Sequence, residues 1–134
     1  MKKTLSLVIM AIMAIAAYAA DMELYYQGSQ FGVIKTNGDV VIRGTTVGQF
    51  RSNGDIVVRG TTMGKIDSDG TIRRQGSTIG KVTSDGDVVD MGTTVGKIRS
   101  DGDVVKHGST IGKVRNLNDK KKVAAVYFFN FFGL

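Results

Sequence analysis

The sequence contains no cysteine and no proline, and it contains a single histidine. Without cysteine the chain forms no disulfide, so packing and hydrogen bonds have to supply its stability. Without proline, every residue of a strand can donate its backbone N–H to a neighbouring strand. One histidine leaves little material for the nucleophile and base pairs or the ligand sets of enzymes. These absences favour a β-rich protein without catalytic chemistry.

No motif of a known catalytic or cofactor site is present either. The chain has no GxSxG elbow and no glycine-rich loop between a strand and a helix. His107 shares its repeat column with Arg43, Arg59, Gln75 and Met91, which indicates a position with loose structural demands. The SDGD segments lack the glutamate that completes a calcium loop, so turn chemistry explains them. We predict no enzyme activity, no cofactor and no bound metal.

The first 19 residues are typical of a secretory signal peptide. Lys2-Lys3 precede an apolar run, Leu5–Ala17, and the small-x-small pattern Ala17-Tyr18-Ala19 suits a signal peptidase. The apolar run is shorter than the ~20 residues that cross a bilayer as a helix. We therefore predict cleavage after residues 1–19 and export to the periplasm, the cell envelope or the extracellular space, where nucleic acid is not an expected partner.

One phrase of 16 residues is repeated five times in succession. Each copy holds TNG, SNG or SDG between two short runs of Val, Ile and Thr, which is a β-hairpin pattern. The copies start at Gly32, Gly48, Gly64, Gly80 and Gly96, and Gly112 opens a half copy. Repeats of this kind bury their apolar faces against their neighbours. The region 20–117 is thus predicted to be one domain of hairpins.

Charges and apolar residues indicate the register of each hairpin. A three-residue loop places Lys35 opposite Asp39, whereas a two-residue Asn-Gly or Asp-Gly turn would place Lys35 beside Val40. The three-residue loop also pairs apolar residues in every copy, and we favour it for that reason. These pairs are Ile34 with Val40, Phe50 with Ile56, Ile66 with Ile72, Val82 with Val88 and Ile98 with Val104.

The two ends of the repeat region complement each other. Residues 23–31 match the second half of a copy, and Gly112–Asn116 match the first half. In the favoured register Arg115 faces Glu23 and Val114 faces Leu24, so a composite sixth unit obeys the same rules. We therefore predict about twelve strands in up-and-down order, closed into a ring that leaves no free edge.

A ring of twelve strands is wider than the eight whose side chains fill a barrel, so its centre needs a filling. Residues 118–134 suit this role, because Asn118 or Asp119 can cap a helix and the residues after Lys122 are almost all apolar. The repeat glycines would let the strands approach this helix. A second column is apolar, and the sequence leaves its direction open: Phe31, Val47, Met63, Ile79, Val95 and Ile111.

The SDG and NG hairpins, the GSTIGK-type corners, the signal peptide and the aromatic tail together resemble the β-flower family of small secreted bacterial repeat proteins. The resemblance covers residues 22–134 and implies hairpin petals around an axis, with no biochemical role attached to it. In architecture the chain is also similar to the Tubby C-terminal fold, a closed barrel around a hydrophobic helix, although no Tubby motif is present. That likeness implies phospholipid head-group binding by analogy of fold alone.

The candidate contact surface is a column of lysines that ring closure would bring to one height, joined by Lys120–Lys122. Its members are Lys65, Lys81, Lys97 and Lys113. With a formal net charge of +6, we predict a non-catalytic exported envelope module, monomeric, that binds an anionic lipid or polysaccharide surface or an envelope protein. Two alternatives stay open: the lysines are ordinary solvated charge, or the chain is a purely structural, adhesin-like repeat.

Overall fold

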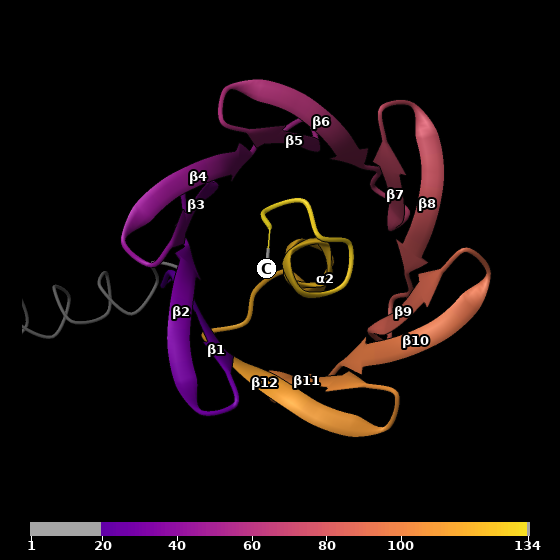
Figure 1. The fold of residues 1–134 in the computed structure, drawn as a ribbon. Helices are drawn as coiled ribbons and strands as arrows, with labels where there is room; N and C mark the ends of the chain where they lie inside the picture. Colours follow the sequence, from indigo (N-terminus) through magenta and orange to yellow (C-terminus); the bar gives the residue numbers. More distant parts are fainter. Residues whose placement is uncertain (1–19, 134) are drawn as a thin grey trace, which may run out of the picture.

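The computed structural model describes residues 20–133, which form twelve β-strands and one helix around a common axis (Figure 1). The strands are β1 (Met22–Tyr26), β2 (Ser29–Ile34), β3 (Asp39–Ile42), β4 (Thr45–Phe50), β5 (Asp55–Val58), β6 (Thr61–Ile66), β7 (Thr71–Arg74), β8 (Ser77–Val82), β9 (Asp87–Asp90), β10 (Thr93–Ile98), β11 (Asp103–Lys106) and β12 (Ser109–Arg115), and the helix is α2 (Lys120–Tyr127). The mainly β fold class is confirmed. The expected signal peptide lies outside the described residues.

The strands form a closed antiparallel barrel. Each strand pairs with its neighbours in the sequence, and β1 pairs with β12 to close the ring. Glu23 lies opposite Arg115 and Leu24 opposite Val114, so the predicted composite unit is present. Closure leaves no strand with unpaired backbone groups at a sheet edge.

The predicted three-residue loops are confirmed. Lys35 N donates to Asp39 O at 2.8 Å, and Gly38 N donates to Lys35 O at 2.9 Å. Gly38 has φ of +97°, a conformation that only glycine adopts without strain. The apolar pairs follow as predicted: Ile34–Val40, Phe50–Ile56, Ile66–Ile72, Val82–Val88 and Ile98–Val104.

A second set of turns was not predicted, and it forms the outer tips of the petals in Figure 1. Arg43 and Gly44 both have positive φ, 49° and 82°, as in a type I′ turn. Every residue in the Arg43 column therefore has to adopt a left-handed backbone conformation. The interpretation that His107 occupies a structurally undemanding position is wrong. The residues with φ of 47° to 50° are Gln27, Arg43, Arg59, Gln75, Met91 and His107. The SDG-type loops lie at the other end of the strands.

A β-bulge in each long strand settles the direction of the second apolar column. Val40 pairs with Gly48 and Val41 pairs with Thr46, so Val47 is the extra residue between them. A bulge re-aims its side chain. Val47 and its counterparts Met63, Ile79, Val95 and Ile111 are half-buried against the core, and Phe31 is buried within it.

Helix α2 occupies the centre of the ring (Figure 1). Its residues Val123–Val126 are buried, and the Asp119 carboxylate accepts from Lys121 N at 2.9 Å and Lys122 N at 3.4 Å as an N-cap. The helix ends at Tyr127, earlier than predicted, and residues 128–133 continue in turns. Asn130, the polar residue within this apolar run, takes φ of 53°, a left-handed backbone angle that interrupts a helix.

The tail after α2 fits the repeat glycines. A Cβ on Gly64 would lie 2.7 Å from the Phe131 ring, and one on Gly96 would lie 2.6 Å from the Phe128 ring. Gly48 meets Phe132, Gly80 meets Phe129 and Gly112 meets Tyr127 in the same way. Tyr127 at the end of α2 and four aromatics of the tail thus contact five glycines.

Candidate functional site

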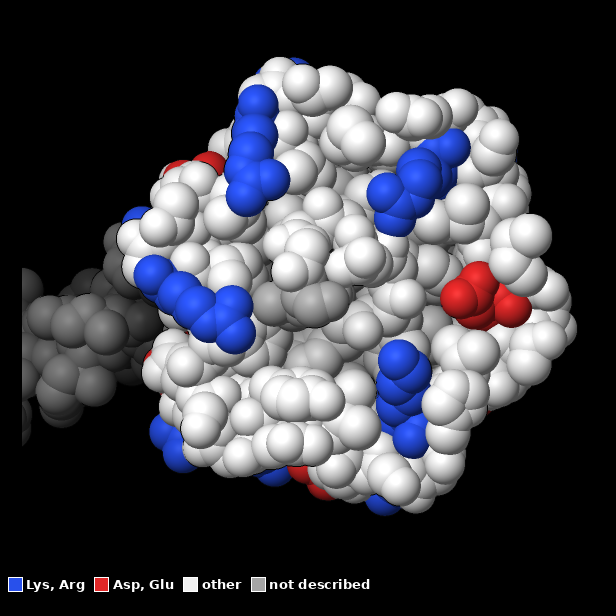
Figure 2. All heavy atoms as spheres, viewed as in Figure 1, with Lys and Arg blue, Asp and Glu red and all other residues white. Residues whose placement is uncertain are grey.

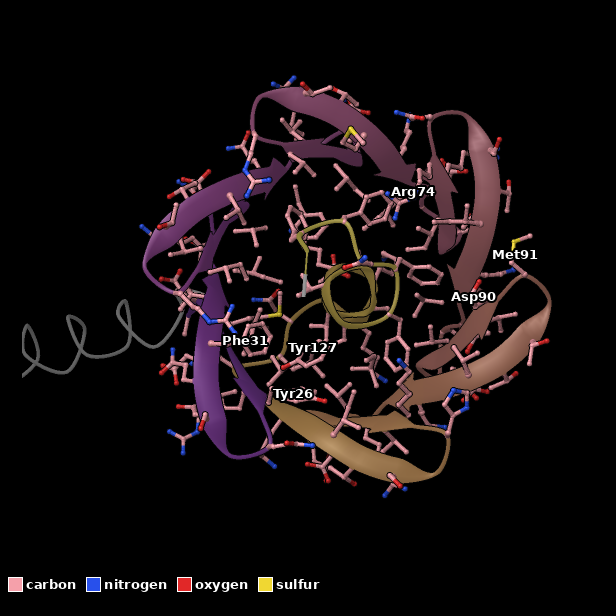
Figure 3. The ribbon with its side chains drawn as sticks, viewed as in Figure 1. Tyr26, Phe31, Arg74, Asp90, Met91 and Tyr127 are labelled. Carbon is pink, nitrogen blue, oxygen red and sulfur yellow. The ribbon has the colours of Figure 1, made fainter. Side chains whose placement is uncertain are left out.

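The ring has two ends of different chemistry. We call loop end the end with the three-residue loops and the start of α2. We call turn end the opposite end, with the type I′ turns and residues 128–133. Figures 1 to 3 are viewed from the turn end.

The predicted lysine column lies on the outer wall. Each of its members precedes a residue whose side chain is buried in the core. Because side chains alternate along a strand, each lysine points outward. Lys97 Nζ lies 3.5 Å from Asp87 Oδ1, and Lys113 Nζ lies 3.3 Å from Asp103 Oδ1. Lys65 and Lys81 are exposed. The four lysines share a height because they occupy one repeat column. They do not converge, because outward side chains diverge around a closed barrel.

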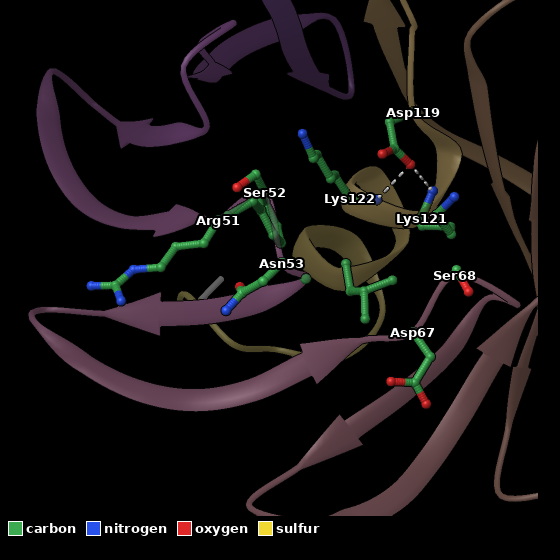
Figure 4. Close-up of a pocket in the computed structure, with 11 residues that line it drawn as sticks. Arg51, Ser52, Asn53, Asp67, Ser68, Asp119, Lys121 and Lys122 are labelled. Carbon is green, nitrogen blue, oxygen red and sulfur yellow. Dashed lines mark hydrogen bonds between the residues drawn. The ribbon is translucent and has the colours of Figure 1, made fainter.

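The loop end carries both signs of charge. A pocket of about 280 Å³ lies between the loops of β4–β5 and β6–β7 and the start of α2, with Arg51, Asp67, Asp119 and Lys122 among its lining residues (Figure 4). Lysines 120–122 therefore lie at this end, among carboxylates, and not with the lysine column.

Aspartates of the loops hold the backbone of their own turns. Asp69 Oδ1 accepts from Thr71 N at 3.0 Å, and this hydrogen bond lowers the pKa of the Asp69 carboxyl. The hydrogen bond from the Thr83 hydroxyl lowers the pKa of Asp85 in the same manner. These acids stay charged and make the loop end a weak site for an anion.

The turn end is predominantly basic. Two columns reach it, the strand-end residues and the first residues of the type I′ turns, and they contain four cations and one acid. The cations are Arg43, Arg59, Arg74 and Lys106, and the acid is Asp90. In Figure 2 the Lys and Arg atoms stand apart around this end, and the acidic patch occupies one side.

Exposed apolar side chains lie at the turn end as well. Among the described residues the exposed large hydrophobics are Tyr26, 47% exposed, and Met91, 77% exposed. Met91 is the first residue of a type I′ turn, and Tyr26 ends β1 directly before such a turn. The half-buried bulge column adds apolar surface beneath them. Cations and exposed apolar groups thus share one end of the ring.

A pocket of about 420 Å³ opens at this end. It is lined by Tyr26, Phe31, Arg43, Lys106, Ile111, Tyr127 and Gly133, and Figure 3 shows Tyr26, Phe31 and Tyr127 on the same side of α2. The Phe31 and Tyr127 rings meet edge to face with centroids 5.5 Å apart. The Tyr127 hydroxyl donates to Tyr25 O at 2.7 Å, and burial raises its pKa well above the usual tyrosine range.

Arg74 has a structural role besides its charge. Its guanidinium lies 4.2 Å from the centroid of the Phe131 ring and donates through Nη2 to Phe129 O. It therefore holds the turn that follows α2. Arg43, Arg59 and Lys106 are exposed and are the cations available at this end.

Sequence reasoning missed this basic and apolar end. The signal was present, because every residue of the Arg43 column directly precedes a glycine that recurs every 16 residues. An x-Gly pair between two strand-like runs is a type I′ turn signal, and turns lie at a surface. The variable column was therefore a surface column at one end of the ring.

Other kinds of site are not found in residues 20–133. No group of three His, Cys, Asp or Glu side chains in this part of the chain could hold a metal ion. Of the helices described, none has the length and hydropathy to span a bilayer.

Comparison with known proteins agrees with the fold. The sequence model of a family described as "5-fold beta-flower protein" matches residues 22–132. Neither the curated proteins nor the solved structures contain a significant match. In this chain the five complete copies are joined by the composite unit, so that six hairpins surround α2. The match extends from the first strand to the last aromatic of the plug, and the chain belongs to the β-flower family.

Proposed function

We propose that this protein is a non-catalytic, exported envelope module that docks on anionic lipid surfaces through its turn end. The observation that carries the proposal is the coincidence of the available cations Arg43, Arg59 and Lys106 with the exposed apolar side chains Tyr26 and Met91 on one end of the ring. Export follows from the expected signal peptide over residues 1–19.

The energetics of a membrane surface favour this combination. A Lys or Arg near an anionic leaflet contributes about 1 kcal/mol, which is too little for binding by any one of these residues alone. Tyr26 and Met91 add apolar area that can enter the region between head groups and acyl chains, where amphipathic side chains prefer to lie. Several weak cationic contacts and shallow apolar insertion act together when they share one surface.

The outer wall is the weaker candidate. Two of its four predicted lysines already face aspartates at 3.3 and 3.5 Å, so lipid phosphates would have to compete with these carboxylates. A flat membrane also meets only one side of a ring at a time, whereas the turn end can present all its cations together. Anionic lipid binding by Lys65, Lys81, Lys97 and Lys113 stays a prediction.

Vesicle flotation tests the proposal. The chain without its expected signal peptide should float with vesicles of phosphatidylcholine and phosphatidylglycerol and should stay behind with phosphatidylcholine alone. Raising the salt from 0.05 to 0.5 M, which cuts the Debye length to about a third, should weaken the binding. Absence of flotation at low salt would overturn the proposal and would favour a glycan, an envelope protein or a purely structural role.

A further inference from the structure

We propose that the turn-end pocket binds a medium-chain fatty acid, with its carboxylate at the rim residue Arg43 and its chain against Phe31, Ile111 and Tyr127. This inference rests on the proposed lipid-binding function of the same end, and it adds one defined ligand and one defined position.

The pocket lies beside Gly32, the repeat glycine that the aromatics of residues 127–132 do not contact. Tyr127 and the four aromatics after it contact five of the six repeat glycines. At the sixth, Gly32, the atoms nearest to an added Cβ are Val41 O, Ile42 Cδ1 and Leu24 Cδ1, which belong to the ring itself. Gly32 is thus the repeat glycine whose nearest contacts are not aromatics of residues 127–132, and its neighbour Phe31 lines the pocket together with Tyr127.

The wall of the pocket suits an acyl chain. Phe31 is 9% exposed, Ile111 and Tyr127 are half-buried, and the Tyr127 hydroxyl is already bonded to Tyr25 O. The Tyr127 ring packs edge to face on the Phe31 ring, and the two rings form an apolar surface. Such a surface with few polar groups is typical of small-molecule sites.

The charges at the rim select the sign of the ligand. Arg43 and Lys106 are both exposed lining residues, and none of the lining residues within the described part of the chain is Asp or Glu. Asp90, the acid of this end, lies on the other side of α2 from Phe31 in Figure 3. An arginine and a lysine at the rim favour an anionic head group, and charge-assisted hydrogen bonds are the strongest of their kind.

The size of the pocket limits the ligand. About 420 Å³ lies near the lower end of the roughly 300–1,000 Å³ of ligand pockets. One chain of moderate length with a compact head fits this volume better than a phospholipid with two chains. A carboxylate is the compact head that an arginine binds through two parallel hydrogen bonds.

The test uses sodium decanoate, below the concentration at which it forms micelles, and decyl maltoside as the uncharged control. Binding is measured by nuclear magnetic resonance on the chain without its expected signal peptide. Arg43→Gln removes one of the two rim charges, and Arg59→Gln, outside the pocket lining, is the matched control, because both residues are exposed and occupy the same turn position with φ of 49°. Ile111→Phe fills the pocket with a side chain that its repeat column already holds at Phe31.

We expect decanoate to shift the signals of Tyr26, Phe31 and Ile111, and decyl maltoside to leave them unchanged. Arg43→Gln should weaken decanoate binding about tenfold or more, the value of one charge-assisted hydrogen bond, and Arg59→Gln should leave the affinity within about twofold. Ile111→Phe should abolish decanoate binding, while thermal unfolding shows that this variant is still folded. Unshifted pocket signals, or equal effects of the two arginine variants, would overturn the inference. Vesicle binding that persists in that case keeps the proposed function, and decanoate binding without vesicle binding overturns the function alone.

Discussion

Gly80 in β8 lies directly against the ring of Phe129, so that a Cβ on Gly80 would come within 2.5 Å of the ring carbons Cε1 and Cζ. Real Cβ atoms do not approach so closely, and the missing side chain is the reason that strand and plug can touch. The same fit at four further glycines makes the aromatic tail a part of the barrel core.

The first prediction concerns this contact. Gly80→Ala should destabilise the protein by roughly 1–3 kcal/mol or more, the usual cost of overpacking a dense core. The added Cβ also meets Val89 O at 2.5 Å, so part of the cost is independent of the ring. Urea unfolding of the single variants and of Gly80→Ala with Phe129→Ala separates the two parts. Coupling between neighbours predicts that the double variant costs less than the sum, and strict additivity would contradict the contact.

The second prediction tests the register of the hairpins. Val82 is 2% exposed and lies opposite Val88, so Val82→Asp buries a charge without a partner and should cost several kcal/mol, or shift the carboxyl to its neutral form. Lys81→Gln, one residue away on the outer face, should change stability by less than about 0.5 kcal/mol. Chemical denaturation measures both, and similar losses would mean that the two side chains do not face opposite sides.

The third prediction follows from Tyr127. Burial raises the pKa of its hydroxyl. The unfolded chain releases this proton with the ordinary tyrosine pKa of about 10, whereas the folded protein keeps it at that pH. The stabilisation is complete below pH 10 and is lost as the pH rises above it. Tyr127→Phe should be less stable at pH 8, because it lacks the bond to Tyr25 O, and it should lose less stability between pH 9 and 11.5. Parallel pH profiles for the two proteins would be the contrary result.

The fourth prediction addresses the start of the plug. Asp119 caps α2 by accepting from two backbone N–H groups, so Asp119→Ala should cost about 0.5–2 kcal/mol. The neighbouring exposed Asn118 provides the control, because its side-chain amide reaches only Ala20 O at 3.5 Å. Asn118→Ala should stay within about 0.5 kcal/mol. Thermal unfolding compares them, and equal losses would argue against the cap.

Much of the ring could be predicted from the sequence, because the copies of the repeat can be aligned with one another within a single chain. The pairing of Lys35 with Asp39 recurs in altered form along the chain, and so the register did not depend on any single copy. The complementary half copies at Glu23 and Arg115 likewise predicted the closure. Repeated local patterns with a clear sign of charge or apolarity are the information that a sequence carries most directly.

The features that were not predicted from the sequence depend on contacts between distant residues or on backbone angles. Nothing in VYFFNFF marks the end of α2 at Tyr127, since its limit depends on which rings reach which glycines. The variation of the Arg43 column suggested indifference, although each member holds a left-handed turn. The turn end was missed for that reason, because its cations and exposed apolar residues are spread over six hairpins and meet only in the closed ring.

The central claim is that the turn end, and not the outer wall, meets the lipid surface. Two variants of equal charge test it most directly in vesicle flotation: Arg43→Gln with Arg59→Gln at the turn end, and Lys65→Gln with Lys81→Gln on the wall. At about 1 kcal/mol for each cation near an anionic leaflet, the first should bind phosphatidylglycerol vesicles roughly tenfold to thirtyfold more weakly than the unaltered protein, and the second should bind within about twofold of it. Equal weakening by both, or a larger loss from the wall variant, would contradict the account.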